Sequence, residues 1–138
     1  MAGYVVDSSF IVAGLISERH TPFVRALMGE VLAGSAAAPA HLPLEVANAL
    51  RTKVVRGLIA ADLRDASVAA FLDFGIGFDD APTAAVLARI VRLSDKHGLT
   101  VYDAAYLEMA VRLDADLATL DTALVEAARA EGVRVHAP

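Results

Sequence analysis

The sequence contains no cysteine among its 138 residues. Disulfide bonds, thiolate metal sites and a cysteine nucleophile are therefore excluded, and the composition fits a cytoplasmic setting. Aromatic residues make up only 6% of a chain that is 57% hydrophobic, so the core must consist mainly of Ala, Val, Leu and Ile. No apolar run approaches the roughly 20 residues that span a bilayer, and the N-terminus lacks the regions of a secretory signal. We therefore expect a cytoplasmic protein without a membrane partner.

The length and the charge of the chain set further bounds. Folding buries roughly 70% of the surface of a chain of this size, so we expect a single domain over residues 1–138. The net charge of −5 argues at first against a nucleic-acid partner, because binding phosphates normally takes an excess of Lys and Arg. If four acids bind metal ions, however, the remainder carries only −1, and bound cations reverse the local field.

Basic residues form two sequence clusters, one at residues 51–56 and one at residues 89–96. For the second cluster, a solvated helix face is a better explanation than a binding role. For the first cluster, the two explanations are equally good.

Short β-rich runs alternate with segments of helical periodicity along the whole chain. We expect strands at residues 3–6, 35–41, 75–78, 116–120 and 133–136. Helices are expected between these strands. For three of them we expect an N-cap, at Ser8 or Ser9, at Thr21 and at Asp62. Three others are expected to start at Pro43, at about Pro82 and at Asp103. This alternation predicts an α/β fold, with a mainly parallel sheet covered by helices on both faces.

Four carboxylates stand at the boundaries between these elements: Asp7, Glu45, Asp103 and Asp121. Asp7 and Asp121 each end an apolar strand, and ligands of open α/β sheets bind beyond the carboxyl ends of the strands. Glu45 falls in the first turn of a helix, and Asp103 extends a buried helical stripe, where a carboxylate must be capped, paired or metal-bound. Mg²⁺ and Mn²⁺ take oxygen ligands, and clustered carboxylates otherwise repel each other. The pattern predicts a metal-dependent phosphoryl-transfer site.

Each acid also has a purely structural explanation. Asp7 and Asp121 can cap helices or form Asx turns, and Glu45 favours a helix dipole. Asp116, at the entry of a strand, is a spare candidate about 17 Å from Asp121 at roughly 3.3 Å per residue.

Smaller polar residues fit a supporting role around the acids. Ser9 follows Asp7 by two positions, Thr119 precedes Asp121 by two on the same strand face, and Asn48 continues the helix face of Glu45. For Ser9, simple capping or core hydroxyl bonding is a better explanation than a role at the acidic site. For Thr119, the two explanations are equally good.

Other sites have weaker support. The four histidines are scattered without a metal-ligand spacing and are expected at the surface, and the remaining acids in polar turns. A serine-hydrolase elbow, a dinucleotide loop and a P-loop are all missing. An aspartyl-phosphate phosphatase would place a second acid where Ser9 stands, and a receiver domain would need a lysine at a strand end, where neither Lys53 nor Lys96 falls.

Taken together, four segments resemble the PIN domain, and within it the toxins of VapBC-type toxin–antitoxin pairs. The segments are VVDSS at residues 5–9, LPLEVANAL at 42–50, LTVYDAAYL at 99–107 and LATLD at 117–121.

This resemblance implies a three-layer α/β/α sandwich, Mg²⁺- or Mn²⁺-dependent endoribonuclease activity on an RNA substrate, homodimers, and neutralisation by a small antitoxin. It also implies that Asp7, Glu45, Asp103 and Asp121 are the catalytic metal ligands, which would bind the scissile phosphate through the metal and lower the pKa of the attacking water. A non-catalytic PIN-like binding module and a metal-dependent phosphatase are the alternatives.

Overall fold

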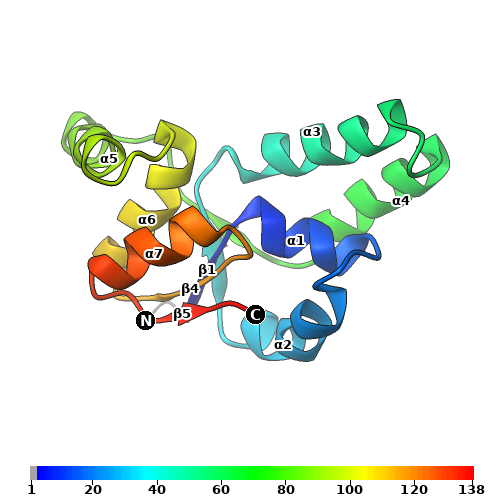
Figure 1. The fold of residues 1–138 in the computed structure, drawn as a ribbon, viewed down its shortest axis with the longest axis horizontal. Coiled ribbons are helices and arrows are strands. Elements are labelled where there is room, and N and C mark those ends of the chain that lie inside the picture. The colour runs from blue at the N-terminus through cyan, green and yellow to red at the C-terminus, as the bar shows by residue number, and fades with distance from the viewer. Residues whose placement is uncertain (1–2) are drawn as a thin grey trace.

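The computed structural model describes residues 3–138 and contains a five-stranded sheet with helices on both faces (Figure 1). The strands are β1 (Tyr4–Val6), β2 (Ala36–Ala38), β3 (Gly77–Phe78), β4 (Asp116–Ala118) and β5 (Val135–His136). The helices are α1 (Ser8–Leu15), α2 (Thr21–Ala33), α3 (Leu42–Val55), α4 (Ala61–Leu72), α5 (Ala84–His97), α6 (Val101–Leu113) and α7 (Thr122–Ala130). The expected α/β sandwich is therefore confirmed.

Every pair of neighbouring strands is parallel, and the strand order is β3-β2-β1-β4-β5. The chain leaves β1 in one direction to form β2 and β3, and then returns to the other side of β1 to form β4 and β5. Right-handed crossovers place α1 to α4 on one face and α5 to α7 on the other, as Figure 1 shows. The order of the strands thus reverses between β1 and β4, where ligands of open α/β sheets bind.

One hydrophobic core joins the two helical layers to the sheet. Val5 and Val6 of β1 are fully buried, as β-branched residues in a central parallel strand should be. Leu107 of α6 and Phe10 of α1 reach this core from the two faces. No helix within residues 3–138 has both the length and the apolar content that crossing a bilayer requires.

The ends of several elements differ from the expectations. Thr21 does not cap α2 but is its first residue, and its buried hydroxyl donates to the carbonyl oxygens of Ala13 and Ile16. α4 begins after Ala60 rather than at an Asp62 cap. β4 ends at Ala118, so the chain from Thr119 to Asp121 is a loop.

Candidate active site

Asp7 follows β1 directly and is the N-cap of α1, so neither Ser8 nor Ser9 caps this helix. Its Oδ1 accepts hydrogen bonds from Phe10 N at 3.0 Å and Ser9 Oγ at 2.7 Å, and its Oδ2 accepts one from Thr119 Oγ1 at 2.5 Å. The residue is only 4% exposed. Burial raises the pKa of Asp7 to about 6 although the three hydrogen bonds lower it, and the charge of Asp121 raises it further.

The loop after β4 brings a second group of polar residues to the same place. Thr119 is fully buried, and its hydroxyl accepts a hydrogen bond from Asp121 N at 3.0 Å while it donates to Asp7. Leu120 N donates to Ser9 Oγ at 2.9 Å. The carboxylate of Asp121 caps α7 by accepting from Ala123 N at 2.9 Å and Leu124 N at 3.3 Å. Because Val6 of β1 pairs with Ala118 of β4, these loops meet at the point where the strand order reverses.

Glu45 reaches this region from the first turn of α3. Its Oε1 accepts a hydrogen bond of 2.5 Å from the hydroxyl of Tyr106 on α6. Nε2 of His41 lies 3.2 Å from the same oxygen without the alignment of a hydrogen bond, and it has no hydrogen-bond partner among residues 3–138. Burial alone would raise the pKa of Glu45, but the contacts with His41 and Tyr106 outweigh it, so the pKa is lowered.

Asp103 lies in the first turn of α6, which begins at Val101 rather than at Asp103 itself. Thr100 is the N-cap, and its hydroxyl accepts a hydrogen bond from Asp103 N at 3.1 Å. The side chain is half-buried. Burial raises the pKa of Asp103, and the charges of Asp121 and Glu45 raise it further.

The four acids therefore come from four separate segments, and the charge of Asp121 raises the pKa of both Asp7 and Asp103. None of them pairs with a lysine or arginine in the part of the chain that the structure describes. Their oxygens are the donors that hard divalent cations prefer, so the chemistry of the group fits Mg²⁺ or Mn²⁺.

The positions of the side chains are not yet those of metal ligands. Within residues 3–138, no three of the His, Asp and Glu side chains stand where they could share one metal ion. Asp7, Glu45 and Asp121 instead bind nearby protein donors, which satisfies carboxylates that repel each other. Closing the group around an ion would require these side chains to rotate.

Two residues at the site were not expected from the sequence. Tyr106 donates to Glu45, and His41 packs edge-to-face against Tyr106 with 5.1 Å between the ring centroids. Helical spacing was the available signal, because Tyr106 follows Asp103 by three residues and His41 precedes Glu45 by four. Asn48, which the sequence suggested, is exposed one turn beyond Glu45.

The expectation that the histidines lie at the surface was wrong for at least three of them. The side chains of His41, His97 and His136 are 24%, 12% and 18% exposed, and each faces a carboxylate. Nε2 of His136 lies 2.8 Å from Oδ2 of Asp116, which also lies 3.8 Å from Nε of Arg134. Asp116 thus has structural partners at the start of β4, away from the four acids.

The chain belongs to the PIN domain family, which matches residues 4–130. The ribonuclease VapC3 of Pyrobaculum aerophilum is 38% identical over 82 residues, which make up 59% of this chain and 63% of that protein. The chain thus spans less than two thirds of the length of this relative.

Two solved structures share the fold. The sarcin-ricin loop cleaving toxin VapC20 of Mycobacterium tuberculosis superimposes with a TM-score of 0.73 at 14% identity, covering 91% of this chain and 95% of that one. VapBC2 of Rickettsia felis, bound to a DNA fragment from its promoter, has a TM-score of 0.68 at 13% identity, with 97% of both chains covered. The expected PIN resemblance is confirmed.

Proposed function

We propose that this protein is a metal-dependent endoribonuclease and the toxin of a toxin–antitoxin pair. The observation that carries the proposal is the buried carboxylate of Asp7, which is held by two hydroxyls and one amide where the strand order reverses. Three further acids come to the same region from α3, α6 and the loop after β4, and none of them pairs with a lysine or arginine in the described residues. Membership of the PIN family and the similarity to a protein named as a ribonuclease support the same activity.

Each residue of the site has a part in this proposal. Asp7, Glu45, Asp103 and Asp121 would hold one or two Mg²⁺ or Mn²⁺ ions, which supply a lowered pKa for the attacking water and charge stabilisation at the phosphate. Ser9 and Thr119 orient Asp7 through their hydroxyls, and Tyr106 orients Glu45. Asn48 faces solvent beside Glu45, where it can contact the substrate.

The activity is tested by incubating the purified protein with structured RNAs and Mn²⁺ or Mg²⁺, with and without EDTA. We expect internal cleavage that needs the metal and that Asp7→Asn abolishes while circular dichroism shows an intact fold. Cleavage that persists in EDTA, or equal cleavage by the variant, would contradict the proposal.

The same assay separates the two alternatives. A non-catalytic PIN-like module would bind the RNA without cutting it, and a phosphatase would release phosphate from p-nitrophenyl phosphate. The structure argues against an aspartyl-phosphate phosphatase, because Ser9 occupies the position of its second acid and donates a hydrogen bond to Asp7.

We also propose that the protein forms homodimers and binds a small antitoxin through α1 to α3, in the cytoplasm. Exposed apolar side chains continue this surface from α3 onto α4, and such patches mark interaction sites: Leu44, Val55, Leu58, Leu63 and Leu72. Light scattering across micromolar concentrations tests self-association, and a strict monomer would contradict it. Co-expression with any small protein that is found to be encoded immediately upstream tests the antitoxin, and the absence of a complex would count against it.

A further inference from the structure

A small cavity opens beside Glu45, between the loop before α3 and the loop before α5. Its volume is about 220 Å³, which is smaller than the roughly 300–1,000 Å³ of sites for drug-sized ligands. Pro39, Pro82, Ile90 and Ala105 give it apolar walls, and His41 joins it to the neighbourhood of Glu45. The cavity therefore has room for one flat heterocycle rather than for a length of chain.

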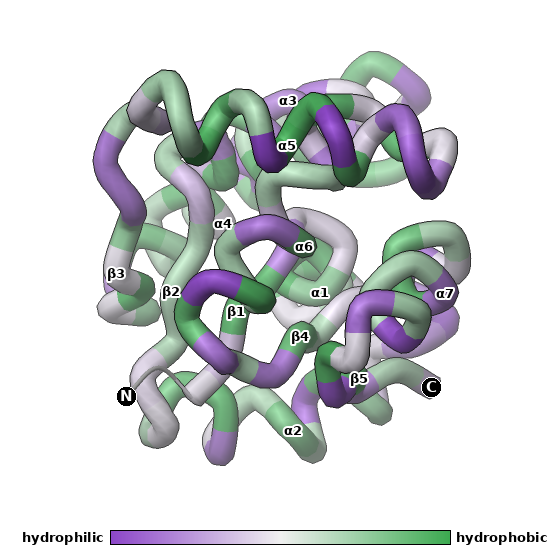
Figure 2. Tube along the Cα trace, turned by 90° about the vertical axis from the view of Figure 1, so that its left-hand side faces the viewer, coloured by the Kyte–Doolittle hydropathy of each residue, from purple (hydrophilic) through white to green (hydrophobic). Residues whose placement is uncertain are grey.

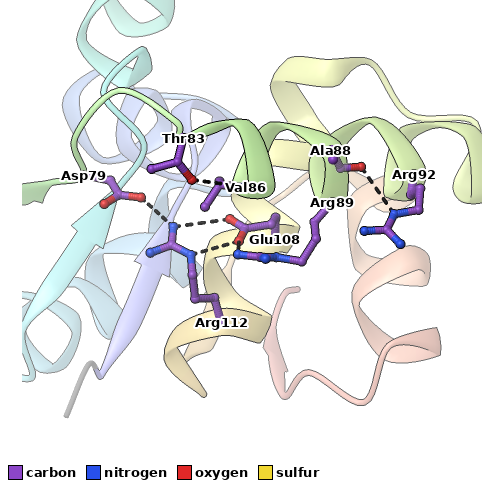
Figure 3. Close-up of polar contacts among 8 residues, drawn as sticks. All are labelled: Asp79, Thr83, Val86, Ala88, Arg89, Arg92, Glu108 and Arg112. Atoms are coloured by element: carbon purple, nitrogen blue, oxygen red, sulfur yellow. Dashed lines mark hydrogen bonds and ion pairs between the residues drawn. The ribbon is translucent and has the colours of Figure 1, made fainter.

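The charged groups of the cavity are almost completely compensated (Figure 3). Glu108, which is 2% exposed, binds Nε of Arg112 at 2.8 Å and Nη2 of Arg89 at 3.3 Å. Arg112 also contacts Oδ2 of Asp79 at 2.5 Å. The two guanidinium groups thus balance two of the carboxylates.

Asp80 is the carboxylate of this cavity that has no cationic partner within residues 3–138. A free carboxylate accepts N–H donors and repels anions. A phosphate would therefore be disfavoured here, whereas a neutral ring that presents N–H groups would be favoured.

Tyr102 lies next to this cavity, against its lining residue His41. It lies one helical turn before Ala105 on α6, and its ring packs edge-to-face against His41 with 5.7 Å between the centroids. The residue is 63% exposed although it is large and aromatic, and it directly precedes Asp103. Exposed aromatic rings beside a nucleic-acid path commonly stack on unpaired bases.

We propose that the cavity receives one nucleobase of single-stranded RNA and that Tyr102 stacks on that base at the entrance. This inference rests on the proposed function, because it makes the cavity the base-binding part of the same site. The base would sit next to Glu45 and Asp103, so its own phosphate would reach the four acids. The protein would then select unpaired segments of RNA, since a base in a duplex cannot enter the cavity.

The test measures base stacking without requiring cleavage. Single-stranded oligonucleotides that carry one 2-aminopurine are titrated with protein in Ca²⁺, a cation that takes oxygen ligands and keeps the four acids compensated, and both the fluorescence and the anisotropy are recorded. We expect the wild type to quench the 2-aminopurine. Tyr102→Ala should weaken binding about 5- to 160-fold, from the roughly 1–3 kcal/mol of one base–aromatic stack, and Tyr102→Phe should bind like the wild type.

Two further variants locate the effect. Ala81→Trp places a large side chain in the cavity from an exposed loop and should also weaken binding. Val111→Ala removes an apolar side chain on α6 that is 47% exposed and stands nine residues after Tyr102, and it should change nothing.

Each outcome bears on the proposal separately from the enzymatic activity. Unquenched fluorescence, or equal binding by Tyr102→Ala, would overturn the base site even if the wild type cleaves RNA. A Tyr102→Ala variant that changes only its oligomeric state in light scattering would also overturn it, because the ring would then serve a protein interface. Quenching that depends on Tyr102 would support the base site even if no RNA is cleaved.

Discussion

The carboxylate of Asp7 destabilises the metal-free fold at neutral pH. Its pKa is about 6 in the folded state, raised chiefly by burial above the ordinary value of 3.8. The folded protein therefore holds a proton that the unfolded chain has lost between about pH 4 and pH 6. Stability from this group falls as the pH rises through that window, by about 3 kcal/mol in total at 1.36 kcal/mol per pKa unit.

Asp7→Asn should remove this pH dependence. In EDTA we expect the variant to be more stable than the wild type at pH 7, by up to about 3 kcal/mol, and similar to it near pH 4. Urea unfolding between pH 4 and pH 8 measures the difference. If the difference in the free energy of unfolding between the two proteins does not grow with pH, burial of the charged Asp7 carboxylate does not destabilise the fold.

A second pair of variants tests the assignment of Asp121. Asp121→Asn keeps a good N-cap for α7 but loses a carboxylate, so metal-dependent cleavage should fall by about 10-fold or more, as loss of metal affinity implies, and excess Mn²⁺ should partly restore it. Asp116→Asn breaks the contact with His136 instead, so it should lower stability and leave cleavage nearly unchanged. RNA cleavage rates across a Mn²⁺ titration compare the two. Equal losses of activity for the two variants would contradict the assignment of the site to the end of β4 that carries Asp121.

The individual acids and the supporting hydroxyls of Ser9 and Thr119 could be read from the sequence, but which side chains bond to which acid could not. Asp7, Thr119 and Ser9 are close in the structure because β1 and β4 are neighbours, which no local pattern predicts. The contact between Tyr106 and Glu45 joins residues 61 positions apart. Glu108 was overlooked because a carboxylate on a buried helix face has no sequence signature apart from Arg112 four residues later.

At the scale of elements, the helices were easier to predict than their first residues. Gly98 ends α5 in the left-handed region, with φ of 64°, because glycine adopts it without strain. The start of α6 was placed two residues late, since Thr100 and Asp103 both suit a first turn and only the packed structure decides between them. β4 was drawn too long because the alternation of Leu117 and Thr119 continues past its last ladder residue.

The charge of Glu108, buried on α6, is compensated by Arg112 of the same helix and by Arg89 of α5, which gives a third prediction. Arg112→Ala removes two of the hydrogen bonds to Glu108 and the contact with Asp79. We expect the free energy of unfolding to fall by about 2–3 kcal/mol. This is less than the full cost of an unpaired buried charge, because Arg89 still pairs with Glu108. Arg92→Ala is the matched control, because Arg92 bonds only to Ala88 within its own helix and should change stability little. Urea unfolding measures both.

Adding Glu108→Gln to Arg112→Ala tests the cause. A neutral amide is cheaper to bury than a carboxylate, so the double variant should recover part of the loss. A double variant that is less stable than Arg112→Ala would show that packing, not charge, sets the cost.

For the whole molecule, metal binding should raise the stability of the fold. An ion that binds only the folded state at 100 times its Kd adds about 2.7 kcal/mol, so Mn²⁺ should increase the Tm by several degrees. The shift should vanish for Asp7→Asn and persist for Asp116→Asn. A thermal-shift titration in the absence of RNA gives this result independently of catalysis, and an equal shift in all three proteins would indicate non-specific binding.

The shallow burial of α5 has a consequence for the time course of opening. Ile90 is its only buried residue, and polar and apolar residues mix along its length at the edge of the molecule (Figure 2). Val86 and Leu93 pack against the core while partly exposed, and ion pairs to Glu108 of α6 and to Glu131 after α7 add to the contact. Partly exposed pairs of this kind are worth about 0.2–1 kcal/mol each and weaken with salt.

Amide protons of α5 should therefore exchange with deuterium sooner than those of α1, through an opening that leaves the sheet intact. Raising NaCl from 0.05 M to 0.5 M should speed exchange in α5 several-fold and leave α1 unchanged, which mass spectrometry of peptic fragments resolves. Uniform acceleration in both helices would mean that the chain opens as one unit. If α5 does open alone, the cavity beside Glu45 periodically loses a wall, and a bound base could leave by that route before the phosphate does.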